Sequence, residues 1–382
     1  MKKTLFLALG AALLALVSCN KNAATSSIPD GKSAQVTLSI KGGSEPTKAA
    51  PVADDEVRIN AIDAFVFNAT GDLDAYGHYS SYSSSSKPIL DCTTGAGKRF
   101  YVIINSGWSQ SELATGIATE ADLKALVFQL SQNRRGSTLD NFQMISTEVT
   151  KDGNSTIDLT PGANEVKVTV SRVVSRVWIK KITRNFTSGA LSGPLTVKGI
   201  YVSNATGSYG LDGSVKDAAT DTWYNKYDGT ASPAVVAKDS GMAPWLDAGI
   251  SPVTLAQGAS STAVESTFYV MANQTPYDAP TGGTGAWSPR NTKLVVETEY
   301  AGRTYYYAIP VVEQDQYPEL SDPASFQGLR PNYSYRIDNL ELTRLGSTNP
   351  DEPVLVSNVT VEITVAPWQE VILSTENGKY VI

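Results

Sequence analysis

Few residues in this chain carry the side chains that catalysis, metal binding or cross-linking most often use. The 382 residues include one histidine, His78, and two cysteines, Cys19 and Cys92. They leave little material for a histidine-based triad, a zinc site or a disulfide framework. His78 as a ligand or general base is one interpretation, but its Tyr- and Ser-rich surroundings favour a solvated loop residue. The composition therefore argues against most hydrolase and metalloenzyme functions.

Two groups of closely spaced acids match parts of a calcium-binding loop. Asp72 and Asp74 lie in GDLDAYG, and Asp152 begins DGNSTID. A twelve-residue calcium loop closes on a bidentate glutamate, and the corresponding position after Asp152 is Ala163. We therefore expect these acids to be turn residues. We predict no cofactor, no metal site and no enzymatic activity.

Cys19 has the clearest chemistry. Two lysines precede the apolar run Leu5–Val17, which is too short for a bilayer that needs about 20 residues and instead indicates a secretory leader. The segment LVSC that ends at Cys19 resembles the bacterial lipobox, where a peptidase cuts before a cysteine whose sulfur is diacylated. We predict a signal peptide over residues 1–18 and a lipid anchor on Cys19. Cys92 is then expected to be a buried, inert small residue.

The composition favours an all-β protein. The net charge is −7, and an acidic chain without basic clusters disfavours a nucleic-acid partner. Charged residues make up only 18% of the chain, whereas 30 glycines, 19 prolines and 18 tyrosines are typical of short strands joined by turns.

Alternating apolar residues predict strands along most of the chain, with one short helix after Thr119, where Asp122 completes a capping box and apolar residues recur up to Leu130. The most economical arrangement is two β-sandwich domains that meet near Arg172–Arg176. The predicted divisions are a propeptide over 19–48, an N-terminal domain over 49–175, a C-terminal domain over 176–350 and a tail over 351–382. The strands are expected at 34–41, 59–67, 100–104, 166–170, 173–179, 195–202, 266–271, 292–300, 303–311, 334–342 and 359–365.

Two isolated strands have the same pattern. Near the start of the chain, apolar residues alternate at Val36, Leu38 and Ile40. Near its end they alternate at Val359, Val361, Ile363 and Val365. Either could form the edge of a sandwich, where a neighbouring molecule can supply a missing strand. Lys48 follows the first strand in a loop of the kind that proteases cut readily. A cut after Lys48 would release residues 19–48. The other interpretation is a permanent edge strand and a solvated lysine.

Several further motifs occur in a characteristic order. They are IDAFVFNATG from Ile62, KRFYVIIN from Lys98, VSRVVSRV from Val170 and PNYSYRI from Pro331. Together with the lipobox, the first strand and the final strand before Pro367, they resemble the Bacteroidales fimbrillins, the FimA-type fimbrial subunits. Each motif is weak alone, and the resemblance rests on their order over nearly the whole chain.

The resemblance implies two transthyretin-like β-sandwich domains in tandem with a C-terminal donor-strand region. It implies a precursor that is lipidated, carried to the outer membrane, and cut by a trypsin-like protease that removes the first strand. The C-terminal strand of a neighbour then fills the groove. The implied partners are copies of the chain, related fimbrial subunits, the protease and a receptor on a host or bacterial surface. The family's usual processing residue is arginine, whereas this loop offers Lys48, with Arg58 as the alternative beside the next strand.

A rival function is that of a monomeric glycan-binding lipoprotein on the cell surface. Trp108, Trp223, Trp245 and Trp287 could stack on sugars, or they could be core and loop anchors. The principal prediction is a structural subunit of an adhesive surface fimbria that catalyses no reaction. The sequence leaves open whether it would be a stalk, tip or anchor subunit.

Overall fold

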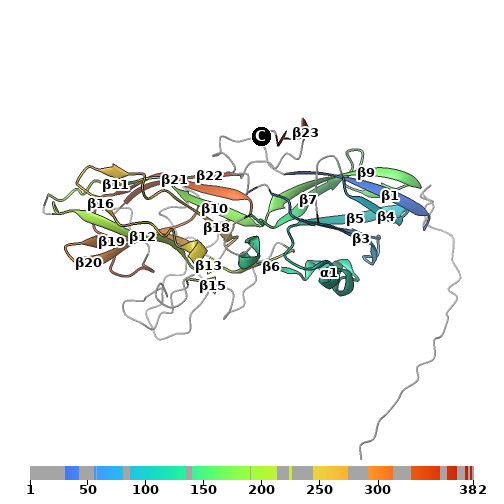
Figure 1. The fold of residues 1–382 in the computed structure, drawn as a ribbon, viewed down its shortest axis with the longest axis horizontal. Coiled ribbons are helices and arrows are strands. Elements are labelled where there is room, and N and C mark those ends of the chain that lie inside the picture. Colours follow the sequence, from blue (N-terminus) through green and yellow to red (C-terminus); the bar gives the residue numbers. More distant parts are fainter. Residues whose placement is uncertain are drawn as a thin grey trace, which may run out of the picture.

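The computed structural model confirms the all-β class. The described residues form two β-rich units placed end to end, with two short helices beside the first (Figure 1). Cys19 and Lys48 lie outside the described part of the chain, as does Trp287. The structure describes residues 31–42, 56, 58–80, 87–134, 140–189, 191–212, 223–225, 244–273, 291–312, 328–352, 359–367, 375–376 and 379–380.

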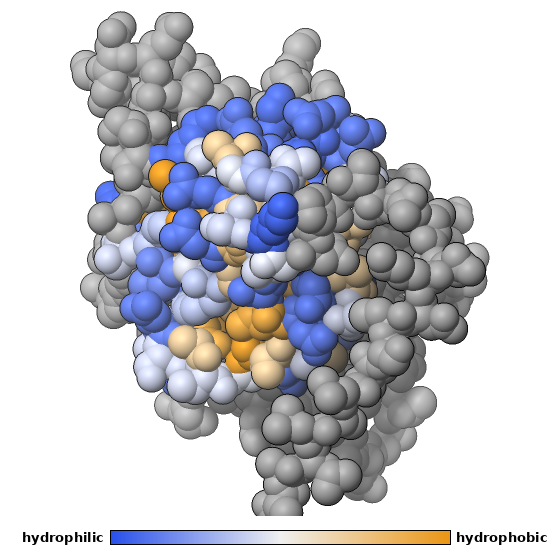
Figure 2. Space-filling model, turned by 90° about the vertical axis from the view of Figure 1, so that its right-hand side faces the viewer, coloured by the Kyte–Doolittle hydropathy of each residue, from blue (hydrophilic) through white to orange (hydrophobic). Residues whose placement is uncertain are grey.

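The first unit is one curved sheet of eight strands in the order β3-β2-β5-β7-β9-β1-β4, with β8 paired to β5. Buried and less buried side chains alternate along β1, β4 and the first part of β9, as expected for strands with one face on the core, whereas all six residues of β2 are buried. Seen from the free end of this unit, most of the described surface is hydrophilic around a small hydrophobic area (Figure 2). The strands are β1 (Ser33–Gly42), β2 (Ile62–Phe67), β3 (Leu73–Tyr79), β4 (Ile89–Thr93), β5 (Gly95–Ile104), β7 (Met144–Thr150), β8 (Ile157–Leu159) and β9 (Gly162–Arg172).

Side chains join the two ends of this sheet, β3 and β4. Asp74 on β3 accepts hydrogen bonds from the backbone nitrogen and the hydroxyl of Thr93 at 3.0 and 2.7 Å, and it forms an ion pair with Lys98 at 2.9 Å. The Tyr79 hydroxyl donates to the carbonyl of Ile89 on β4. These contacts shield backbone edges that would otherwise be open to other chains.

The second unit consists of two facing sheets (Figure 1). In the larger sheet, one edge of β21 pairs with β10 and then with β11, and its other edge pairs with β22. The smaller sheet has the order β16-β12-β19-β20. The strands of the larger sheet are β10 (Val174–Ile179), β11 (Ile182–Arg184), β17 (Ser260–Ser261), β18 (Ser266–Met271), β21 (Tyr333–Leu342) and β22 (Val359–Pro367). Those of the smaller sheet are β12 (Leu195–Ser203), β16 (Val253–Leu255), β19 (Lys293–Tyr300) and β20 (Arg303–Pro310).

The remaining elements are short. They are helices α1 (Gln110–Gly116) and α2 (Glu120–Lys124), the 3-10 turns η2 (Leu130–Asn133) and η3 (Pro244–Leu246), and strands β6 (Val127–Gln129), β13 (Ala205–Thr206), β14 (Ser208–Gly210), β15 (Trp223–Tyr224), β23 (Thr375–Glu376) and β24 (Lys379–Tyr380).

The expected helix up to Leu130 is only partly correct. The capping box is present, because Thr119 and Asp122 exchange hydrogen bonds at the start of α2. The helix nevertheless ends at Lys124, and Val127–Gln129 forms strand β6. This strand pairs with β14 of the second unit, so a contact distant in sequence overrides the local helical spacing. Helix α1, with its own capping box at Ser109, was not predicted.

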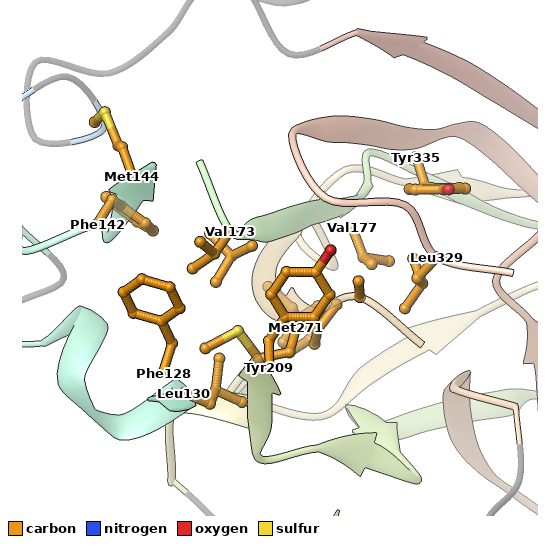
Figure 3. Close-up of a cluster of buried hydrophobic side chains, with 14 of the residues drawn as sticks. Phe128, Leu130, Phe142, Met144, Val173, Val177, Tyr209, Met271, Leu329 and Tyr335 are labelled. Carbon is orange, nitrogen blue, oxygen red and sulfur yellow. The ribbon is translucent and has the colours of Figure 1, made fainter. Parts of the chain in front are cut away.

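A continuous hydrophobic core crosses the junction between the units. Only Val173 separates β9 of the first sheet from β10 of the second, and it is fully buried. Phe128 and Phe142 from the first unit approach Tyr209 and Met271 from the second (Figure 3). The Phe142 ring centroid lies 4.7 Å from that of Tyr269. Together with the β6–β14 pair, this packing joins the units without a flexible linker.

Candidate functional site

Strand β1 lies inside the first sheet. It runs antiparallel to β4 from Ser33 to Thr37 and parallel to β9 from Ala34 to Gly42. The sequence admitted an edge position for this strand, but β4 occupies the edge and β1 has a backbone neighbour on each side. Loss of β1 would therefore leave a gap with two walls.

The side chains of β1 alternate as the sequence predicts. Val36 and Leu38 are fully buried, and Ile40 is 5% exposed. On the outer face, Gln35 donates to Asp91 at 3.2 Å, and Ser39 donates to Glu165 at 2.7 Å. The inner face fills the core and the outer face is held by polar contacts, so the site fits a strand with apolar inward and polar outward side chains.

Cys92 belongs to the wall that β1 covers. It lies on β4 opposite Ala34, and its side chain points into the core at 7% exposure. Burial, followed by the charge of Asp74, raises the pKa of the Cys92 thiol to about 11. At neutral pH the thiol is protonated and unreactive.

The described residues on either side of the segment that contains Lys48 lie near the end of β9. Gly42 is the last residue of β1 and pairs with Val170. Glu56, on the far side of that segment, accepts a hydrogen bond at its carbonyl from Arg172 Nε at 3.0 Å. Because Val170 and Arg172 are two residues apart on β9, Gly42 and Glu56 both lie near the end of β9, at the junction of the two units.

A buried charge cluster surrounds Glu56, which is 3% exposed. Arg176 Nη1 lies 3.3 Å from both carboxylate oxygens of Glu56, and the Tyr269 hydroxyl donates to Oε1 at 2.6 Å. Burial lowers the pKa of Arg172 to about 10, although Glu56 opposes this shift, so Arg172 is charged at neutral pH. Burial and the charge of Glu56 raise the pKa of Tyr269. Glu56 was not among the residues predicted from the sequence. The available signal was the pair of arginines within VSRVVSRV, because a buried arginine needs a carboxylate or several carbonyl partners.

Arg58, the alternative processing residue, is held in place. Its Nη1 lies 3.0 Å from Asp140 Oδ2, and its carbonyl accepts a hydrogen bond from Asn105 Nδ2 at 2.8 Å. Asn105 Oδ1 also accepts from the backbone nitrogen of Asn60 at 2.7 Å. A protease must draw several residues into an extended conformation, and these bonds oppose that at Arg58.

Strand β22 occupies an edge within the described part of the second unit. It runs antiparallel to β21, from Val359 beside Leu342 to Pro367 beside Tyr333. The inward side chains Val359, Val361 and Ile363 are 1%, 7% and 2% exposed. Val365 lies opposite Tyr335 in the backbone register, and its side chain is outside the described part. In this structure, therefore, β22 packs against its own chain.

The remaining candidate residues have structural contacts. His78 was expected in a solvated loop, but it lies on β3 with Nδ1 2.7 Å from Asp63 Oδ1, because these two residues are paired in the β2–β3 register. Asp63 is fully buried and also accepts from Tyr76 and Ser106 at 2.8 and 2.7 Å. Asp152 lies in an exposed turn. Within the described residues no three His, Cys, Asp or Glu side chains gather into a potential metal site.

The described tryptophans among the glycan candidates pack against other aromatic rings or are buried. Trp108 lies 5.4 Å from Phe128 between ring centroids, and Trp245 lies 5.6 Å from Tyr224. Trp223 is 7% exposed. These contacts do not favour a sugar-stacking surface.

Comparisons with known proteins fit this architecture. Residues 15–176 match the family model of the major fimbrial subunit protein (FimA). The chain is 24% identical to the major fimbrium subunit FimA type-3 of Porphyromonas gingivalis over 97% of this chain and 99% of that protein. Its identity to the type-2 subunit of the same organism is 23%, with the same coverage.

Two solved structures share the fold. A putative cell adhesion protein from Bacteroides eggerthii aligns with a TM-score of 0.59 and 22% identity over 90% of this chain and 98% of its own. A fimbrilin from Porphyromonas gingivalis aligns with a TM-score of 0.58 and 16% identity over 88% and 97%.

The fold is thus that of the Bacteroidales fimbrilins and cell adhesion proteins. The family match and the curated relatives confirm the predicted resemblance to FimA-type fimbrillins, a family of structural subunits of surface fimbriae.

Proposed function

We propose that this protein is a subunit of an adhesive surface fimbria that assembles when β1 is removed and replaced by a strand from a second copy. The observation that carries the proposal is the position of β1. It is a buried strand with two backbone neighbours, and the segment 43–55 that follows it in the sequence contains Lys48. One cut in that segment would separate β1 from the rest of the fold.

The alternation of β22 fits the site of β1. Four inward positions of β1, from Ala34 to Ile40, correspond to four alternating apolar residues from Val359 to Val365. The outward residues Thr360 and Thr364 are small and polar, as Gln35 and Ser39 are polar on β1. Each apolar side chain seated in the groove would contribute about 1.5–3 kcal/mol.

The change in backbone pairing favours transfer of β22. At its own edge β22 pairs with β21, whereas the site of β1 has β4 and β9 as neighbours. A strand that moves from the edge to the groove exchanges one hydrogen-bonded ladder for two. The intermolecular arrangement therefore gains a second ladder of backbone hydrogen bonds for β22, whose inward side chains are already buried against β21.

Processing at Lys48 is favoured over processing at Arg58, because Arg58 and its neighbours are bound to Asn105 and Asp140. We propose that Cys19 carries the lipid that holds the precursor in the outer membrane, and that removal of residues 19–48 releases the subunit for assembly. The partners would be further copies, related fimbrial subunits including tip and anchor proteins, the processing protease and a surface receptor.

Limited trypsin digestion followed by electrophoresis without heating tests the proposal. The intact chain should migrate as a monomer, and SDS-resistant multimers should appear once residues 19–48 are lost. Lys48→Gln should delay both the cut and the multimers. Multimers that form equally well without loss of the N-terminal segment would contradict the mechanism.

A matched pair of variants tests β22 as the donor. Ile363→Asp places a charge on the inward face and should abolish the multimers. Thr360→Asp places the same charge on the exposed face of the same strand and should preserve them. If Ile363→Asp formed multimers as readily as the unchanged chain, β22 would not be the donor strand. The trypsin digestion would still test whether loss of β1 is required for assembly.

A further inference from the structure

The contacts of Glu56 reach both units of the molecule. Its carbonyl accepts from Arg172, the last residue of β9, and its carboxylate accepts from Arg176 on β10 and Tyr269 on β18. Glu56 is the first described residue after the loop over 43–55. We call Glu56 and residues 58–61 the stem, because they lead from this loop into β2.

Three of the motifs that were singled out in the sequence converge on the stem or its partners. VSRVVSRV supplies Arg172 and Arg176. PNYSYRI supplies Asn332, whose side-chain oxygen lies 3.4 Å from Arg172 Nη1, and Ser334, which accepts from Arg176 Nε at 3.1 Å. KRFYVIIN ends at Asn105, which has a φ of 54°. The proposed strand replacement does not itself require these polar residues.

Asn105 binds the stem from the side of the first unit. Its side-chain oxygen accepts from the backbone nitrogens of Asn60 at 2.7 Å and Ala61 at 3.3 Å, and its side-chain nitrogen donates to the carbonyl of Arg58 at 2.8 Å. The stem is therefore bound at both ends, by Asn105 beside β2 and by the arginines at the junction.

We propose that Arg172, Arg176 and Tyr269 form a retention site for the chain's own Glu56, which holds the stem on the junction after the loop over 43–55 has been cut. This inference rests on the proposed function only in that processing is what creates the free end. The occupant is an acidic residue of the same molecule: Arg176 and Tyr269 bind its carboxylate, and Arg172 binds its backbone carbonyl.

The cut changes what the site must do. In the intact chain the stem is restrained on both sides, by β1 through the loop and by β2. After the cut, the upstream restraint is gone and Glu56 is the first described residue of the new terminal segment that is bound to the junction. Terminal segments fray unless specific contacts hold them. A frayed stem would release Asn60 and Ala61 from Asn105. It would also loosen the start of β2, which lies between β3 and β5 in the first sheet.

Amide hydrogen exchange measures the fraying of the stem directly. In the full chain, a recognition sequence for a site-specific protease is placed within residues 44–50, and exchange of the Asn60 and Ala61 amides is followed before and after the cut. In the otherwise unchanged chain the cut should alter exchange by less than about 3-fold. In Glu56→Gln the same amides should exchange at least about 10-fold faster after the cut, and only slightly faster before it.

Two further variants keep the test decisive. Glu265→Gln makes the same substitution at an exposed carboxylate of the second unit and should leave the exchange unchanged. Tyr269→Phe removes one hydrogen bond to Glu56 and keeps the ring beside Phe142, so it should give a smaller acceleration of the same kind if Glu56→Gln does not fold.

The outcomes separate this inference from the proposed function. Equal acceleration before and after the cut, or none in either state, would overturn the retention site. Absence of multimers from the cut chain, with the Glu56→Gln difference intact, would overturn strand replacement and leave the retention site standing.

Discussion

Strands β1 and β22 have nearly the same sequence pattern and different positions in the fold. In both, alternate apolar side chains are buried, with Leu38 fully buried and Ile363 2% exposed. β1 has β4 and β9 on its two sides, whereas β22 pairs with β21 at an edge of the described second sheet. The inward side chains do not distinguish the strands. The number of backbone neighbours does.

This difference bears on which strand is suited to move. β22 can separate from its sheet by breaking one ladder, without a gap opening between two other strands. β1 can leave only if β4 and β9 are both exposed along the vacated site. A subunit that keeps β1 until a covalent cut and presents β22 at an edge would therefore remain a monomer until it is processed.

The largest expected effect tests the two positions with the same substitution. Leu38→Asp in the uncut chain should prevent folding or lower the free energy of unfolding by about 4–5 kcal/mol, because an unpaired charge enters the sheet interior. Ile363→Asp should cost less, since its cost cannot exceed that of detaching β22. Urea denaturation of both variants measures the difference. Equal losses would show that β22 is as firmly bound as β1.

Removal of β1 should uncover one thiol. In a Cys19→Ser chain Cys92 is the remaining cysteine, and its raised pKa and burial under β1 keep it unreactive. Alkylation by a maleimide, followed by mass spectrometry, should accelerate at least about 100-fold when β1 has left, and slow again when a replacement strand is seated. Equally rapid alkylation of the uncut chain would mean that β1 does not cover its wall.

The contacts of Asp74 with Thr93 and Lys98 should make β4, one wall of the β1 site, sensitive to acid. Burial by itself raises the pKa of Asp74. The hydrogen bonds from Thr93, together with the hydrogen bond and positive charge of Lys98, outweigh the effect of burial and hold the pKa below the ordinary 3.8. A carboxylate whose pKa is lower in the folded state than in the unfolded state stabilises the fold at pH values above the unfolded-state pKa. This contribution is lost as the pH falls through the folded-state pKa. At about pH 6, Asp74→Asn should cost about 1–3 kcal/mol in urea unfolding, and the cost should shrink below pH 3.8. A cost independent of pH would exclude this role.

The smallest effect compares one methylene in each strand. Ile40→Val should lower the free energy of unfolding by about 0.5–1.5 kcal/mol. Ile363→Val should fall at or below the lower end of that range, because an edge strand can shift to close a small cavity. Thermal unfolding of the two variants would sharpen the comparison, and a larger loss at Ile363 would reverse it.

Much of the strand content could be predicted because alternation is a local property. The predicted strand over 266–271 coincides with β18, and that over 195–202 falls within β12. The helical spacing up to Leu130 led to the wrong prediction of a helix at Val127–Gln129. These residues form a strand because they pair with Ser208–Gly210, about eighty residues away in sequence. His78 was misplaced for a similar reason, because its partner Asp63 is set by the β2–β3 register.

The sequence by itself determined that the protein is built from alternating strands and that the strands at 34–41 and 359–365 share one apolar pattern, since side-chain periodicity is a property of each local stretch of residues. Only the tertiary structure decided which of them is interior and which lies at an edge, because pairing depends on strands far away in the chain. It likewise decided that Glu56 lies against Arg172, Arg176 and Tyr269, because a buried charge finds its partners through the fold and not through its neighbours in sequence.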